Sequence, residues 1–243
     1  MYTVSRSGPT IAGVIAQIRD VPARVVPYAA STALTRVALA GRAGVLAAMP
    51  RVFDRPTPYA LRSTRVIPST VQTLSARVQV NDDFTNNGVA AEDFLFPEVY
   101  GGPRKEKRYE RSLRYSGILR SGERTVLGQG APLDAYGNLK ASEIQRILTA
   151  VRGNFDPYQN KTTSRRSRKN AKKAPYFAGA VRGTRGIWKR DGRKTLPILI
   201  FITKAPVYRQ RLDFEGIVKR TAEEQFETEF NKAAAAIVAR RGG

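Results

Sequence analysis

The sequence predicts an α+β fold, in which N-terminal helices and a C-terminal helix pack on a mainly antiparallel sheet with long loop extensions. Two observations predict it. Apolar residues recur at helical spacing on the N-terminal side, and the C-terminal segment has the acidic first half and basic end that suit a helix. Short strand-like segments lie between these ends. Long polar stretches interrupt the strand-like segments, so we expect a single domain over residues 1–243 with an inserted, loop-rich region at about 83–190.

Composition narrows the classes of function. The chain has 243 residues and 42% hydrophobic content, which is enough to bury a core. It has no cysteine and no histidine, which removes disulfides, thiolate metal sites and the commonest general base. We therefore expect no metal and no cofactor. The N-terminal residues match neither a signal peptide nor a membrane span, so we expect synthesis and folding in a cytosol.

Periodicity predicts two helices at the N-terminal side. The first covers residues 10–20, and the second begins near Pro27, which suits a first helical turn, and ends at Pro50. Small side chains on one face of the second helix would let another helix approach closely. They predict either the core packing of a helix pair or a contact between subunits. This stripe consists of Ala30, Ala33, Val37, Gly41 and Gly44.

The next segments predict two strands and a loop. Residues 70–80 predict a strand because apolar and polar residues alternate over its second half. Residues 81–93 are polar and predict a surface loop. Residues 94–102 predict a second strand that ends in a glycine turn.

Residues 104–114 predict a charged helix with a solvent-exposed face, because Glu106 and Glu110 are spaced to pair with basic neighbours. Residues 128–137 are irregular, and residues 144–151 predict a short amphipathic helix.

The last third predicts a long loop, two strands and a helix. Residues 154–174 form a basic loop with almost no apolar residues. Residues 176–181 and 196–202 predict strands, separated by a hairpin-like segment that contains Trp188. A helix over residues 214–239 closes the chain, with acidic residues in its first half as the helix dipole favours.

Net charge is the dominant feature of the sequence, because it contains 42 Lys and Arg but only 20 Asp and Glu, which gives a formal net charge of +22. Such a surplus favours a partner rich in negative charge, either nucleic acid or an acidic protein surface. Because no aromatic residue interleaves with the basic run, stacking on bases is not indicated, although Tyr158 and Tyr176 flank it. We expect the run to contact DNA or an acidic surface of a neighbouring subunit. It comprises Lys161, Arg165, Arg166, Arg168, Lys169, Lys172 and Lys173.

The acidic residues do not form a recognisable catalytic pattern, and we predict that the chain is not an enzyme. Metal-dependent nucleases commonly place an acid two positions before a lysine on a core strand, but Ile202 stands two positions before Lys204. Carboxylates on the C-terminal helix could hold a cation, but a run of acids near a helix start more often compensates the helix dipole and aids solubility. The acids considered are Asp82, Asp83, Glu92, Asp93, Asp134, Glu223, Glu224 and Glu227.

The segment Val26–Val37 (VPYAASTALTRV), followed further on by Leu74–Val80 (LSARVQV), resembles the opening of the tailed-bacteriophage minor tail protein Z family of tail completion, or neck, proteins. That opening has a Val-Pro, an Ala-rich turn and Ala-Leu/Ile-Asn-Arg-Val, and then a strand Ala-Arg-Ile-x-Val. Thr35 stands where the family usually has Asn. Further similar segments follow in the same order, namely Val99–Lys107, Asp134–Leu139, Ile147–Thr149 and Pro206–Phe214.

The resemblance implies a virion structural protein, made in the host cytoplasm, that forms a homo-oligomeric ring at the head-proximal end of the tail. It also implies other virion proteins as partners, on the head connector or portal side and at the tail terminator or tail tube, with packaged DNA in the channel as a further candidate partner and no membrane. Charge alone supports an alternative, a stand-alone basic nucleic-acid-binding protein, although the sequence shows no helix-turn-helix, RNA-recognition or zinc motif.

Overall fold

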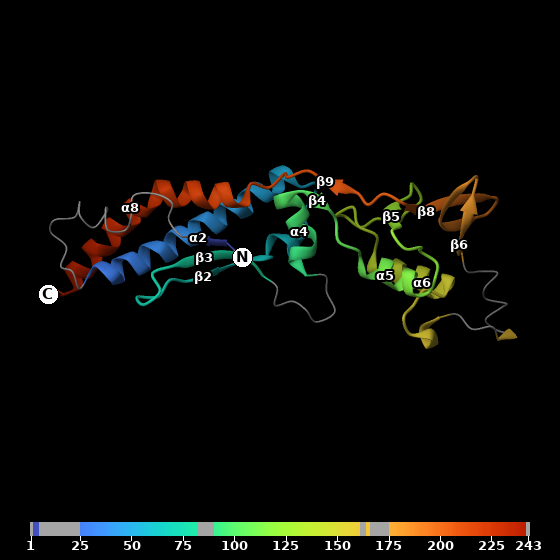
Figure 1. The fold of residues 1–243 in the computed structure, drawn as a ribbon, viewed down its shortest axis with the longest axis horizontal. Helices are drawn as coiled ribbons and strands as arrows, with labels where there is room; N and C mark the ends of the chain where they lie inside the picture. Colours follow the sequence, from blue (N-terminus) through green and yellow to red (C-terminus); the bar gives the residue numbers. More distant parts are fainter. Residues whose placement is uncertain (1, 5–24, 82–89, 161–163, 166–174, 242–243) are drawn as a thin grey trace. The chain divides into compact units, whose positions relative to one another are not determined.

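A computed structural model of the chain describes residues 2–4, 25–81, 90–160, 164–165 and 175–241 (Figure 1). The chain divides into two compact units, which we call unit 1 (Met1–Tyr100 and Gln210–Gly243) and unit 2 (Gly101–Arg209). Helices combine with antiparallel sheets, so the predicted α+β class is confirmed. The predicted insertion at about 83–190 overlaps unit 2 but begins and ends earlier in the sequence.

Unit 1 combines a long helix pair with a three-stranded antiparallel sheet of order β1-β3-β2. In the register of this sheet, Val66 of β2 pairs with Val78 of β3. The predicted helix over residues 10–20 lies outside the described residues. The elements of unit 1 are β1 (Tyr2–Val4), α2 (Val26–Val52), α3 (Pro58–Leu61), β2 (Thr64–Ile67), β3 (Ala76–Val80), α4 (Ala91–Tyr100) and α8 (Phe214–Arg241).

Helices α2 and α8 run antiparallel along each other (Figure 1). Ala33, near the start of α2, packs with Phe230, near the end of α8, whereas Gly41 faces Val218 in the first half of α8. A second apolar cluster joins these helices to β3 and α4. Both helices were predicted from the sequence, although α2 continues two residues beyond Pro50.

Two sequence predictions for unit 1 are wrong in part. Residues 94–102 were expected as a strand but belong largely to helix α4, because Ala91, Leu95 and Val99 recur at four-residue spacing and are buried on one helical face. The strand expected over residues 70–80 is shorter, since residues 71–73 form a turn before β3 begins.

Unit 2 packs helices α5 and α6 against a four-stranded antiparallel sheet of order β5-β8-β7-β6. Two short strands, β4 and β9, pair near its chain ends. The elements of unit 2 are β4 (Gly102–Pro103), α5 (Arg108–Tyr115), β5 (Arg124–Leu127), α6 (Ala141–Val151), η1 (Pro157–Gln159), β6 (Tyr176–Val181), β7 (Thr184–Asp191), β8 (Lys194–Ile202) and β9 (Val207–Tyr208).

The sequence predicted β6, β8 and α6 but missed β5 and β7. The hairpin-like segment around Trp188 is itself the strand β7, which pairs with β6 on one side and β8 on the other. Trp188 is buried there and donates a hydrogen bond from Nε1 to the Gly179 carbonyl at 3.1 Å. As the only tryptophan of the chain, it reports on unit 2 alone.

Candidate interaction surface

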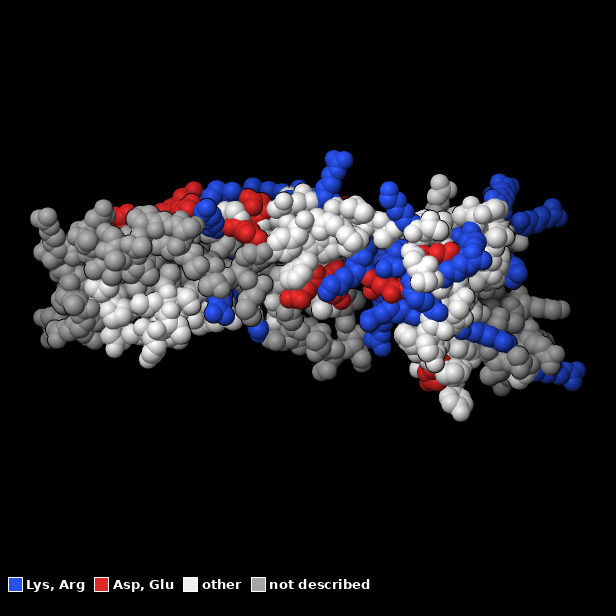
Figure 2. Space-filling model, in the orientation of Figure 1, with Lys and Arg blue, Asp and Glu red and all other residues white. Residues whose placement is uncertain are grey.

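The two units differ sharply in charge. Residues 101–209, which form unit 2, carry 26 Lys and Arg against seven Asp and Glu, a net +19. The remaining residues carry 16 against 13, a net +3. Lys and Arg gather over unit 2, whereas acidic residues mark α8 (Figure 2). Nearly all of the positive surplus therefore belongs to unit 2.

Inside unit 2, Glu110 is fully buried on α5 and is bound by five hydrogen bonds. Arg104 clamps both carboxylate oxygens, with Nη1 2.7 Å from Oε2 and Nη2 2.6 Å from Oε1. The Lys107 backbone N–H donates to Oε2 at 2.8 Å. The backbone N–H and hydroxyl of Thr125 donate to Oε1 at 2.6 and 2.8 Å. The Tyr109 hydroxyl lies 2.8 Å from the Thr125 hydroxyl and extends this network.

This arrangement keeps Glu110 ionised. Burial alone would raise the pKa of the Glu110 carboxyl, but the hydrogen bonds from Arg104, Lys107 and Thr125 outweigh burial and lower the pKa to about 2. Burial also raises the pKa of the Tyr109 hydroxyl to about 12. Because Glu110 stays negative, it compensates the buried guanidinium of Arg104 and ties α5 to β5.

The other glutamates of unit 2 are also used internally. Glu106 pairs with Arg114 at 2.5 Å, Glu123 pairs with Arg185, and Glu143 pairs with Arg146 at 3.2 Å and with the Tyr176 hydroxyl. Asp134 and Asp156 accept hydrogen bonds from backbone N–H groups of their own turns.

Internal pairing thus engages six of the seven acids and leaves the surface of unit 2 strongly basic. Exposed basic side chains of the unit include Arg111, Arg120, Lys140, Arg152, Arg165, Arg182, Arg190, Arg193, Lys194, Lys204 and Arg209.

The prediction of a charged, solvent-exposed helix over residues 104–114 is wrong in its bounds and in the place of Glu110. Helix α5 begins at Arg108, and Glu110 lies in the core and not on a solvated face. Glu106 precedes the helix and pairs with Arg114 eight residues away. Sequence spacing missed this because the partners of Glu110 come from residues on both sides of the helix, including strand β5.

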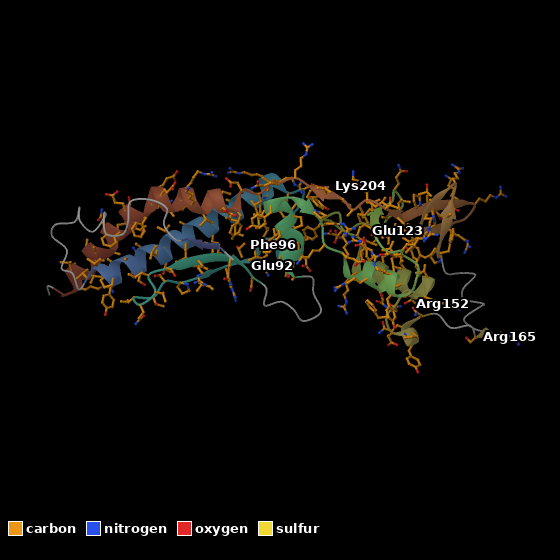
Figure 3. All side chains as sticks on the ribbon, viewed as in Figure 1. Glu92, Phe96, Glu123, Arg152, Arg165 and Lys204 are labelled. Carbon is orange, nitrogen blue, oxygen red and sulfur yellow. The ribbon has the colours of Figure 1, made fainter. Side chains whose placement is uncertain are left out.

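Of the seven residues in the predicted basic run, only Arg165 lies among the described residues, where it is exposed (Figure 3). The other six lie outside them, namely Lys161, Arg166, Arg168, Lys169, Lys172 and Lys173.

The stripe of small residues on α2 is used within the chain. Ala30 and Ala33 are buried against Phe230 and its neighbours on α8. A Cβ at Gly41 would lie 3.4 Å from Val218, and one at Gly44 would lie 3.0 Å from Ile217. Val37, also of this stripe, is buried as well. The stripe therefore packs the helix pair within the chain, and a role of these five residues in subunit packing stays a prediction.

The acids considered for catalysis are dispersed. Glu92 and Asp93 lie in the first turn of α4, and Glu223, Glu224 and Glu227 are exposed on α8. Among the described residues, no group of three acids could hold a metal ion. Asp134 closes a turn in unit 2, and Asp82 and Asp83 lie outside the described residues. That the chain is not an enzyme stays a prediction.

Three exposed aromatic residues in unit 2 were not selected from the sequence as site residues. Tyr115 ends α5, Phe155 follows α6, and Tyr158 lies in η1. The ring centroids of Tyr115 and Phe155 are 5.4 Å apart. The sequence shows Tyr158 only as a residue beside the basic run. The three residues have no common periodicity, so the sequence does not indicate that they belong to one surface.

Comparison with protein-family models, with curated proteins and with solved structures finds no match to this chain. Within the described ranges, none of the helices is both long and apolar enough to cross a bilayer.

Proposed function

We propose that this chain is a bacteriophage tail completion protein that assembles as a ring at the head-proximal end of the tail and joins the tail to the head connector. The observation that carries the proposal is the shared order of the segments that resemble the minor tail protein Z family. The segments run from α2 to the start of α8, so they extend through both units.

The resembling segments include residues that build the cores, which supports a shared architecture over a chance likeness of surface residues. Ala33 of the first segment is buried in the α2–α8 pair, and Ala76 and Val78 of the second are buried in β3. In the third, Arg104 holds the buried Glu110.

The charge of the chain also suits a ring. A cyclic ring is built from heterologous contacts, in which one surface of a subunit binds a different surface of the next. Unit 2 is strongly basic, and α8 of unit 1 exposes Glu223, Glu224 and Glu227. Unit 1 as a whole carries a net +3, but these exposed carboxylates give the basic surface of a neighbouring subunit a local complementary charge, which favours such head-to-tail contacts.

The test has two parts. Mass spectrometry of gradient-purified phage particles should find this chain in the virion. Light scattering of the purified chain should give the mass of an oligomer, and negative-stain images should show that the oligomer is cyclic. A chain that is strictly monomeric and absent from particles contradicts the proposal.

A charge-reversal variant tests the basic run directly. Changing Arg165, Arg166 and Arg168 to Glu should leave the monomer folded but block ring or head–tail assembly, because the complementary surface would then repel it. The control for net charge is the same charge change at Arg182 and Arg193, in the turns on either side of β7, and at Lys194, the first residue of β8, written Arg182→Glu, Arg193→Glu and Lys194→Glu. Normal infectious particles from the first variant contradict a role for the run in assembly.

A stand-alone nucleic-acid-binding protein is the second candidate, and the net +19 of unit 2 favours it. Gel shifts across a salt series separate the two. Tight binding by a monomer, falling steeply with salt, supports this second candidate.

A further inference from the structure

Tyr115 and Phe155, whose rings are in contact, and Tyr158, three residues further along the chain, are exposed aromatic residues of unit 2, and we call the three together the aromatic platform. Their exposed fractions are 73%, 48% and 97%. Tyr115 and Phe155 are in ring contact, with an interplanar angle of 47°, and Tyr158 follows Phe155 by three residues. Large aromatic side chains are the ones that folding most readily buries, so a group of them in solvent points to a partner.

The segment that carries Phe155 and Tyr158 is fixed by hydrogen bonds around the buried Asn154. The Asn154 backbone N–H donates to Oδ1 of Asn160 at 3.0 Å, and its side-chain Nδ2 donates to the same atom at 3.1 Å. Gln145 of α6 donates to Oδ1 of Asn154 at 3.1 Å. The rings are thus displayed by an ordered loop, which limits the entropy lost when they bind.

Two exposed arginines lie within four residues of these aromatic residues in the sequence. Arg111 precedes Tyr115 by four residues on α5, so both lie on one exposed face of that helix. Arg152 follows α6 and precedes Phe155 by three residues (Figure 3). Ser112 of α5 donates to the Gly153 carbonyl at 2.5 Å, which ties the two segments together. Both arginines are exposed, and neither forms an ion pair with another described residue.

Arg152 adopts an unusual backbone conformation. It caps α6 with φ 59° and ψ 39°, the left-handed region in which helices usually place glycine. A residue with a Cβ is strained there. Glycine would therefore be less strained than arginine at this position.

We propose that the aromatic platform and its two arginines bind single-stranded nucleic acid. The rings would stack on unpaired bases, and Arg111 and Arg152 would neutralise phosphates beside them. The net +19 of unit 2 provides the charge complementarity, and stacking on any base makes the binding tolerant of sequence. This inference does not rest on ring assembly, since a monomer or a ring can carry the surface.

The test uses the full chain and fluorescence anisotropy of a labelled oligothymidylate. Tyr115→Ala and Tyr158→Ala should each weaken binding about 5- to 160-fold, the range for loss of one stacked base. Tyr136→Ala, which removes another exposed tyrosine of unit 2, is the matched control and should leave the affinity unchanged. Wild-type affinity in both platform variants overturns the proposal.

A second pair of variants distinguishes binding at the proposed site from general attraction to the net positive charge. Arg152→Gly and Arg182→Gly each remove one charge from a left-handed position, at φ 59° and φ 50°. Both should fold at least as stably as the wild type by Trp188 fluorescence. Only Arg152→Gly should weaken the oligothymidylate complex clearly and lower its salt slope by about 0.7. Equal effects of the two variants would mean diffuse charge attraction and contradict the site.

Competitors decide between ligands. Unlabelled single strands should displace the probe better than duplex DNA of equal phosphate content, because paired bases cannot stack on the rings. Equal competition by duplex DNA or by polyglutamate overturns the single-strand assignment and indicates a general anion-binding surface. Light scattering on the same samples measures the oligomeric state. Loss of the oligomer bears on the ring proposal, whereas loss of oligothymidylate binding bears on the present inference, so the two failures can be told apart.

Discussion

Unit 1 and unit 2 are stabilised in different ways. Unit 1 is nearly neutral, and its two long helices pack through alanine and glycine against apolar side chains of α8. Unit 2 carries a net +19 and holds its helix α5 through the buried pair of Arg104 and Glu110. The difference teaches that a basic unit can fold when its few carboxylates are placed internally, which leaves the surplus charge for a partner.

The first prediction tests the apolar packing of unit 1. Phe230→Ala should lower the free energy of unfolding by about 3–5 kcal/mol, because the ring is 1% exposed and its loss leaves a cavity beside Ala29 and Ala33. Circular dichroism at the helical band, to which α2 and α8 contribute most, should show this loss. Trp188 fluorescence should keep its unfolding midpoint. Equal shifts by both probes would contradict separate stabilisation of the units.

The second prediction tests the ion pair of unit 2. Glu110→Gln should lower the stability reported by Trp188 fluorescence by about 3 kcal/mol, because Arg104 is left with no counter-charge at 10% side-chain exposure. The helical signal of unit 1 should change little. The double variant Glu110→Gln with Arg104→Met removes the unpaired charge as well. If it recovers stability, the loss in Glu110→Gln comes from the unpaired guanidinium and not from a change in side-chain packing.

The Glu110 carboxyl also predicts that the stability of unit 2 depends on pH. The pKa of Glu110 falls from its ordinary 4.5 to about 2 on folding, so its contribution is complete above pH 4.5 and is lost as the pH falls through 4.5 toward 2. The wild-type Trp188 transition should therefore lose about 3 kcal/mol over that interval relative to Glu110→Gln. Parallel pH profiles for the two proteins would contradict this.

Sequence patterns predicted the elements whose signals are local. Helices α2 and α6 have apolar residues at helical spacing, and β6 and β8 have compact apolar runs. The acidic first half and basic end of α8 match the helix dipole. Helix α4 was missed because its aromatic residues favour a strand and Pro97 is unfavourable inside a helix. The buried face consists of Ala91, Leu95 and Val99, which recur at four-residue spacing. Strand β7 was missed because Gly186 and its charged neighbours hide the apolar pair Ile187 and Trp188.

The candidate surface was less predictable than the fold. Which glutamates are buried depends on contacts between segments distant in the sequence, as for Glu123 and Arg185, 62 residues apart. The aromatic platform likewise depends on α5 meeting the loop after α6. Net charge was visible from the sequence, but its concentration in one unit required the unit boundaries.

The smallest predicted effect tests how closely α2 and α8 of unit 1 approach each other. Gly41→Ala should raise stability by about 0.5–1 kcal/mol, because glycine is unfavourable inside a helix and the new Cβ would meet Val218 at an ordinary 3.4 Å. Gly44→Ala is the matched control on the same face, and its Cβ would lie only 3.0 Å from Ile217, so its gain should be smaller or reversed. Thermal unfolding followed at the helical band measures both. If Gly41→Ala destabilises unit 1, the helices approach more closely at Gly41 than these distances show, and the packing described here for that turn is incorrect.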